Sequence, residues 1–259
     1  MWLETLKDRN VHLLIFGAFN LSLAILFFIF SRFSDVEIMG VNAWYKPIKF
    51  ALSIGIFSLT MAWYTGYLES DQSVIYYNWG IILTLGFEII YIAIQAGRGE
   101  LSHYNQTTPF FAIMYVFMAL AATIATLWTG WIGLRFFTEE FPQLPDYYLW
   151  AIRLGIILFV IFSLEGFVMG SRLSHTIGGS DGGSGLPFLN WSFKYGDPRV
   201  AHFIGMHALQ ILPVLSFYVI KNVRITIFGG IIYGLLAGYV LWVALQGQSL
   251  FRLFTVNKF

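Results

Sequence analysis

Residues 109–134 read PFFAIMYVFMALAATIATLWTGWIGL, a run without a single charged side chain. An α-helix needs about 20 apolar residues to cross the hydrocarbon core of a bilayer, and this run is long enough. The rest of the chain has the same character, because 58% of its 259 residues are hydrophobic and only 11% are charged. This composition predicts an integral membrane protein whose main solvent is lipid.

Six further runs resemble the one at 109–134. Together they predict seven transmembrane helices near residues 11–31, 46–68, 75–97, 109–134, 147–170, 199–220 and 225–249. A helix satisfies its own backbone hydrogen bonds inside lipid, and no period-2 alternation favours the strands of a barrel. No polar linker is long enough to divide the chain. We therefore predict an all-α fold, a polytopic bundle of about seven helices forming a single domain over residues 1–259.

The connecting loops differ between the two sides of the membrane. Seven crossings place the termini on opposite sides, and the loops 32–45, 98–108 and 171–198 fall on the side of the C-terminus. These loops are the longest, and the third contains the stretch GGSDGGSG at 178–185. Long glycine-bearing loops often carry function, so a site is expected on this side. The positive-inside count favours the same side in the cytoplasm, and the orientation stays open.

Charge and cysteine content exclude several classes of function. The formal net charge is +1, which gives no general attraction to nucleic acid, and no nucleic-acid partner is expected. The chain has no cysteine, so it can form no disulfide, thiolate metal site or iron–sulfur centre. Any metal must be held by nitrogen, oxygen or methionine sulfur.

Four of the five histidines fall toward the side of the C-terminus. His103, His175 and His202 lie on three different segments and could converge on one zinc or iron ion as its ligands. His207 is five residues after His202, about 140° around the helix, and is predicted to be a separate, deeper group near Glu165 or Gln210. We assign Glu165 and His207 the catalytic role of handling protons, because an ionisable residue inside a membrane marks a functional site.

Cations gather at the same end. We expect an anionic group to be held by Lys49, Arg98, Arg172 and Arg199. Three predicted helices also begin there, and their N-terminal N–H groups favour an anion as well. The ligand class that fits is anionic or amphipathic, such as a lipid-like or quinone-like molecule. The plainer interpretation is that these residues form buried ion pairs or lie at the lipid headgroups.

Four functions remain open from the sequence. The first is a metal-dependent membrane enzyme, a hydrolase or an oxidoreductase, that acts on the amphipathic ligand. The second is a haem b-binding oxidoreductase with axial histidines and a basic end for the propionates. The third is a proton-coupled transporter or ligand-binding protein, and the fourth is an oligomer or complex subunit whose polar end docks a partner. Membrane lipid is a partner in every case.

Overall fold

The computed structural model describes residues 2–69 and 71–253 and divides the chain into two compact units, Met1–Arg135 and Phe136–Phe259. The fold is all-α, with seven helices long and apolar enough to cross a membrane, as the sequence predicts. The chain is therefore a multi-pass membrane protein. The boundary between the units falls near the end of the fourth spanning helix, and the single domain over 1–259 stays a prediction.

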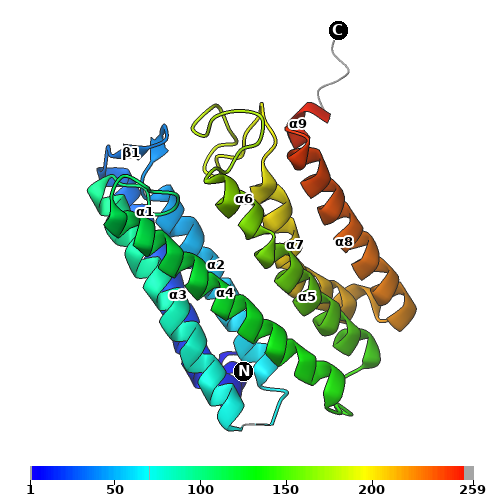
Figure 1. The fold of residues 1–259 in the computed structure, drawn as a ribbon. Helices are drawn as coiled ribbons and strands as arrows, with labels where there is room; N and C mark the ends of the chain where they lie inside the picture. The colour runs from blue at the N-terminus through cyan, green and yellow to red at the C-terminus, as the bar shows by residue number, and fades with distance from the viewer. Residues whose placement is uncertain (1, 70, 254–259) are drawn as a thin grey trace. The chain divides into compact units, whose positions relative to one another are not determined.

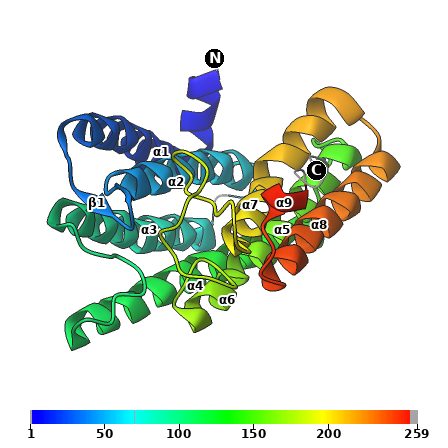
Figure 2. The same ribbon diagram turned by 90° about the horizontal axis from the view of Figure 1, so that it is seen from above.

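The first unit contains four spanning helices and one short hairpin (Figure 1). In chain order its elements are α1 Trp2–Phe33, β1 Glu37–Ile38, β2 Val41–Asn42, α2 Tyr45–Thr65, α3 Gln72–Arg98 and α4 Pro109–Thr138. Viewed from above, α2 lies between α1 and α3 (Figure 2). The hairpin pairs Glu37 with Asn42, and its turn places both Met39 and Gly40 at positive φ. The hairpin belongs to the loop between α1 and α2.

Glycines let α1 and α2 approach closely. A Cβ built on Gly17 would lie 3.1 Å from the carbonyl oxygen of Gly55, so a larger residue would force the helices apart. Small residues serve this purpose in membranes because lipid tails do not drive helices together as water does. Near its start α1 is kinked at Asn10, whose side-chain amide donates to Thr65 Oγ1 at 2.8 Å and to Asn78 Oδ1 at 2.9 Å. This buried amide ties α1 to both α2 and α3.

The second unit contains three spanning helices. Its elements are α5 Asp146–Leu164, α6 Gly166–Arg172, α7 Pro198–Leu215, the π-helical turn η1 Ser216–Ile220, α8 Val223–Leu245 and the short α9 Leu250–Leu253. The helices α5 and α6 form one span with a break at Glu165, and α7 and η1 form another. Pro213 lies just before the π-helical turn, where its missing N–H already weakens the regular hydrogen-bond ladder.

Glycines also control the packing of α5, α7 and α8. A Cβ on Gly155 of α5 would lie 3.0 Å from the carbonyl oxygen of Ala208, and a Cβ on Gly205 of α7 would overlap the ring of Phe162. On α8, Gly230 and Gly234 face leucines of α5. The α5–α7 contact is thus the closest part of this unit.

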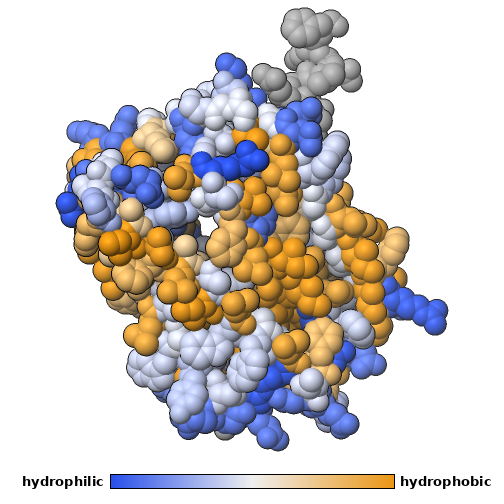
Figure 3. All heavy atoms as spheres, in the orientation of Figure 1, coloured by the Kyte–Doolittle hydropathy of each residue, from blue (hydrophilic) through white to orange (hydrophobic). Residues whose placement is uncertain are grey.

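Apolar side chains remain exposed on the outward faces of the helices. Leu83, Val116 and Leu235 are examples, all more than 60% exposed. Figure 3 shows hydrophobic side chains gathered along the helices and hydrophilic ones at their ends. In water such a surface would be costly, whereas lipid solvates it at no penalty. The exposed faces therefore agree with a membrane as the solvent.

The seven predicted spans correspond to seven in the structure, with differences in their bounds. The first helix begins at Trp2, well before the predicted residue 11. The run at 147–170 is interrupted at Glu165, which lies between α5 and α6. The run at 225–249 ends early, at Leu245, because Gly247 adopts a φ of +73° that a right-handed helix cannot continue. Hydrophobic length predicts a span but does not mark where its backbone breaks.

Replacing Gly205 by alanine should destabilise the second unit. The added methyl group would collide with Phe162 and push α7 away from α5, which we expect to cost about 1–3 kcal/mol. The measurement is the thermal unfolding midpoint of the purified protein in detergent. The matched control is Gly238→Ala on α8, where a Cβ meets nothing within 4 Å. Equal midpoints for the two variants would contradict the close α5–α7 packing.

Candidate functional site

Glu165 occupies the break between α5 and α6. Its backbone N–H still bonds to the carbonyl of Ile161, at 3.0 Å, while its own carbonyl accepts from Val168 in a tighter turn. The side chain is only 4% exposed. The following residue, Gly166, has no side chain and faces the imidazole of His202 on α7. The break thus brings a buried carboxyl to the α7 surface.

Glu165 and His202 approach each other without forming a hydrogen bond. His202 Nδ1 lies 3.4 Å from Glu165 Oε2. This distance is within range of an ion pair, but the atoms are not aligned for hydrogen bonding, and both carboxyl oxygens and Nδ1 are buried without a partner. Leaving a buried polar atom unpaired typically costs about 1–3 kcal/mol. Buried polar atoms without hydrogen-bond partners are rare and call for an explanation. A hydrogen atom between the carboxyl and the imidazole would give both groups a partner.

His207 lies farther along α7 with a partner of its own. Its Nδ1 is 3.1 Å from Gln210 Oε1, and its ring packs edge-on against Phe203 at 4.3 Å between centroids. Gln210 is one of the two neighbours that the sequence suggested. His202 and His207 accordingly have different surroundings, because Glu165 lies against His202 and Gln210 lies against His207.

The loop after α6 is organised around Asp181. Its carboxylate accepts hydrogen bonds from Ser174 Oγ, from the backbone N–H groups of His175 and Thr176, and from Thr176 Oγ1. It also pairs with His175 Nδ1 at 2.8 Å. Burial alone would raise the pKa of Asp181, but the hydrogen bonds from His175 and Thr176 and the charge of His175 outweigh it and hold that pKa well below its usual range. Asp181 is therefore the anchor of the loop.

Arg199 is bound by the same loop. Its guanidinium forms two bonds to Asp197, at 2.8 and 2.6 Å, and one to the carbonyl of Asn190 at 2.6 Å. Asp197 also caps α7 by accepting the backbone N–H of Arg199. These contacts give Arg199 a clear structural partner. Arg172, in contrast, is exposed at the end of α6.

The glycine-rich stretch packs closely against its surroundings. Gly179 lies against the ring of Tyr195, and Gly178 lies against Gly247 after α8. The loop crosses itself through paired backbone hydrogen bonds between Ile177 and Gly196. The glycines here permit these approaches, which a Cβ would block at Gly179.

The first unit holds a second group of polar residues. Lys46 Nζ at the start of α2 lies 3.1 Å from Nδ1 of His103, in the loop after α3. Glu88 of α3 is 5% exposed. Lys49 is half-buried one turn into α2, and Arg98 at the end of α3 is exposed with its guanidinium 5.8 Å from the Phe111 ring.

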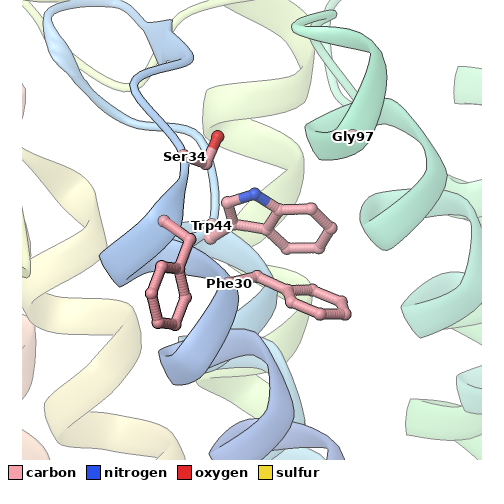
Figure 4. Close-up of a pocket in the computed structure, with 5 residues that line it drawn as sticks. Phe30, Ser34, Trp44 and Gly97 are labelled. Carbon is pink, nitrogen blue, oxygen red and sulfur yellow. The ribbon is translucent and has the colours of Figure 1, made fainter.

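Two open hollows of the first unit contain none of the predicted site residues. One, of about 290 Å³, is lined by Phe30, Phe33, Ser34, Trp44 and Gly97 (Figure 4). The other, of about 300 Å³, lies between α3 and α4 and is lined by Leu83, Thr84, Phe87, Phe117, Leu120, Ala121 and Ile124. Their linings are chiefly aromatic and aliphatic, which suits lipid chains rather than a charged ligand.

The predicted metal ligands are distributed over both units. His103 belongs to the first, and His175 and His202 belong to the second. Within residues 2–69 and 71–253 no three His, Asp or Glu side chains form a group that could hold a metal ion. The three-histidine site stays a prediction without support from this part of the chain.

Two pairings were missed by sequence reasoning. Asp181 was not identified as the partner of His175, and Lys46 was not linked to His103. The only local signal for the first was the polar run Ser174-His175-Thr176 a few residues before Asp181. The second joins residues far apart in the chain, for which the sequence holds no signal.

No family model, no curated protein and no solved structure matches this chain.

Replacing Asp181 by asparagine should destabilise the loop at neutral pH. Asparagine cannot carry the charge that pairs with His175 or accept the same set of hydrogen bonds, and we expect a loss of about 1–3 kcal/mol. The folded-state pKa of Asp181 is depressed, so its contribution is fully present above the unfolded pKa of about 3.9 and is lost as the pH falls below it.

Thermal unfolding midpoints of wild type and Asp181→Asn, measured from pH 7 downward, check this expectation. The gap between the two should be constant above about pH 4 and narrow below it. Glu140→Gln, an exposed carboxyl of the same unit, serves as the control and should show a small gap throughout. A gap for Asp181→Asn that does not change with pH would be inconsistent with a depressed pKa.

Proposed function

We propose that this chain is a proton-coupled membrane protein, a transporter or ligand-binding protein, in which Glu165 binds the proton and His202 is its partner. One observation carries the proposal. His202 Nδ1 and Glu165 Oε2 lie 3.4 Å apart in a membrane-spanning part of the second unit, and these facing atoms are buried without a hydrogen-bond partner. A proton is the smallest ligand that removes this deficit.

The chemistry of the bound state follows from the two groups. A protonated Glu165 carboxyl is neutral, which lowers the cost of keeping it inside lipid. Its O–H can donate to Nδ1 of His202, and the hydrogen of the neutral imidazole then resides on Nε2. When the proton leaves, a carboxylate faces a ring nitrogen that no longer receives a hydrogen bond. The interaction between the two helices therefore differs between the protonated and deprotonated states.

The position of Glu165 gives protonation a mechanical consequence. Glu165 is the joint between α5 and α6, and His202 belongs to α7, so the pair connects α6 to α7. The loop anchored by Asp181 follows directly after α6. A change in the Glu165–His202 contact would thus be passed to α6 and to this loop. Coupling of proton binding to substrate binding requires a part of the protein that has two arrangements, one favoured when the proton is bound and the other when it is absent. In this proposal that part is α6 with the loop that follows it.

The substrate in this proposal is an anionic or amphipathic molecule. In the second unit, Arg172 supports it, because this cation is exposed at the end of α6. Arg199 is a weaker candidate, since Asp197 and Asn190 already bind its guanidinium. Lys49 and Arg98 are the corresponding cations of the first unit. Which face of the membrane is cytoplasmic is still predicted only by the positive-inside count.

A metal or haem at the histidines remains the alternative. The residues described here offer no group of three ligands, so no observation favours it over the proton. The predicted role of His207 in handling protons stays a prediction, and its hydrogen-bond partner is Gln210. Elemental analysis of the detergent-purified protein decides between the two functions, because stoichiometric zinc or iron would overturn the proton-coupled proposal.

Replacing Glu165 by glutamine should abolish proton binding at this site. The test is infrared difference spectroscopy between acidic and neutral pH on the protein in lipid. A buried carboxylic acid absorbs at higher wavenumber than a hydrated one, so wild type should show a high-wavenumber C=O band that Glu165→Gln lacks. The control Glu140→Gln removes an exposed carboxyl and should keep the band.

Glutamine has nearly the shape of a protonated glutamic acid, so the variant should fold and elute as wild type does. A difference spectrum in which Glu165→Gln matches wild type would show that Glu165 takes up no proton over this range and would remove the basis of the proposal.

A further inference from the structure

The first turns of α1 are held against the end of α2. The backbone is non-helical at Asn10, and the turns before this kink point away from the rest of the helix (Figure 2). The Asn10 amide donates to Thr65, the last residue of α2, and Leu6 is fully buried. Arg9 lies between these two anchors, so its side chain is kept at the end of α2.

The guanidinium of Arg9 lies in a corner formed by two aromatic rings. Its Cζ is 3.8 Å from the ring centroid of Trp63 and 4.1 Å from that of Tyr67, and the two rings are nearly perpendicular. A Cβ on Gly66 would collide with Cβ and Cγ of Arg9, so this glycine makes room for the arginine stem. Cation–π attraction to the two rings therefore fixes where the charge lies.

The hydrogen bonds of Arg9 leave one edge of the guanidinium available. Nη1 donates to the carbonyl oxygen of Trp63 at 3.1 Å. Nε and Nη2 donate to no acceptor within residues 2–69 and 71–253, and neither is among the buried atoms that lack a partner, so both are accessible. The N–H groups of this edge are parallel and match two oxygens of one carboxylate or one phosphate.

Arg199 shows what the same edge binds elsewhere in this protein. Its Nε and Nη2 donate to the two carboxylate oxygens of Asp197, at 2.8 and 2.6 Å. Arg9 has the same pair of donors, but it forms no ion pair with a carboxylate in the part of the chain that the structure describes. Its charge and its two-pronged donor therefore call for an anion with two neighbouring oxygens.

Arg9 lies where the first span approaches the membrane surface. Residues 13–30 of α1 carry no charged side chain, and Arg9 is about one helical turn before them. Trp63 and Tyr67 are aromatic residues of the kind that gather at the level of the lipid headgroups. A phosphodiester is the anion that phospholipids supply at this level, and it provides both the counter-charge and the two oxygens.

We propose that Arg9 binds the phosphodiester of one phospholipid through Nε and Nη2, in the leaflet on the side of the N-terminus. The site belongs to the first unit and goes beyond the function proposed above, since it involves neither Glu165 nor His202. The aromatic corner and the Trp63 carbonyl orient the guanidinium, and the lipid phosphate completes its hydrogen bonds.

Arg153 of α5 provides a matched control. Its guanidinium also lies in a corner of two rings, Phe137 and Trp150, and these rings are 6.4 Å apart at 87°, as at Arg9. Arg153 donates to a main-chain carbonyl as well, that of Phe136, but it does so through Nε at 2.7 Å. The edge that is available in Arg9 is thus already used in Arg153.

The test is native mass spectrometry of the delipidated protein in detergent, titrated with a short-chain phosphatidylglycerol. Arg9→Lys keeps the charge but lacks the planar pair of donors, so the affinity for the first bound lipid should fall about tenfold, as expected for the loss of one charge-assisted hydrogen bond. Arg153→Lys should leave this affinity unchanged. Gly66→Ala, which displaces the Arg9 stem without changing any charge, should weaken binding as Arg9→Lys does.

A diacylglycerol with the same acyl chains has no phosphate and should bind wild type more weakly than phosphatidylglycerol does. Equal affinities of wild type for the two lipids would overturn the proposal without the need for any variant. An unchanged affinity in Arg9→Lys, or equal losses in Arg9→Lys and Arg153→Lys, would overturn it as well. Displacement of the lipid by an equal concentration of inorganic phosphate would show that the ligand is free phosphate and not a phospholipid.

Discussion

The hydrocarbon core of a membrane offers no hydrogen bonds, and this constraint shapes every element of the chain. It requires continuous helices and confines irregular backbone to places where protein covers it. Three interruptions inside spans obey this rule. At the α1 kink the Asn10 side chain bonds to Thr65 and Asn78, and Glu165 still accepts and donates along α5 and α6. At the π-helical turn after Pro213 the Ser216 hydroxyl donates to the carbonyl of Tyr147. The same lack of water makes an unpaired carboxyl costly, so Glu165 is the residue whose presence most needs a functional explanation.

Close packing of α5 against α7 at glycines holds the Glu165 carboxyl next to His202. Gly155 and Gly205 allow α5 and α7 to touch along their length, and Gly166 leaves the space into which the His202 ring fits. A looser pair of helices would let Glu165 turn toward water or lipid headgroups. The backbone thus enforces a contact that the two side chains do not stabilise by a hydrogen bond in this arrangement. That contact is sensitive to whether a proton is present.

Hydrophobic length alone predicted the fold class and all seven spans, because a helix in lipid is dictated by about 20 apolar residues and by little else. Spacing along single helices was informative as well, and it separated His207 from His202. Spacing along one helix could not predict which side chains of different segments pair. Lys46 meets His103 only through the packing of α2 beside α3, and Asp181 meets His175 only because the glycine-rich loop folds back on itself. A single sequence does not indicate which polar side chains come into contact after folding.

Each unit holds a deeply buried glutamate, Glu88 on α3 and Glu165 between α5 and α6, and Glu165 lies beside a nitrogen base, His202. A buried ion pair kept only for stability is a poor choice, because well-packed apolar residues usually do as well or better. Glu165 differs from such a pair, because both of its carboxyl oxygens and the facing His202 Nδ1 are buried without a hydrogen-bond partner. A protonated carboxyl has an O–H that can donate to the ring nitrogen. In the function proposed above, proton binding at Glu165 is therefore the event that most directly changes how α6 and α7 hold together.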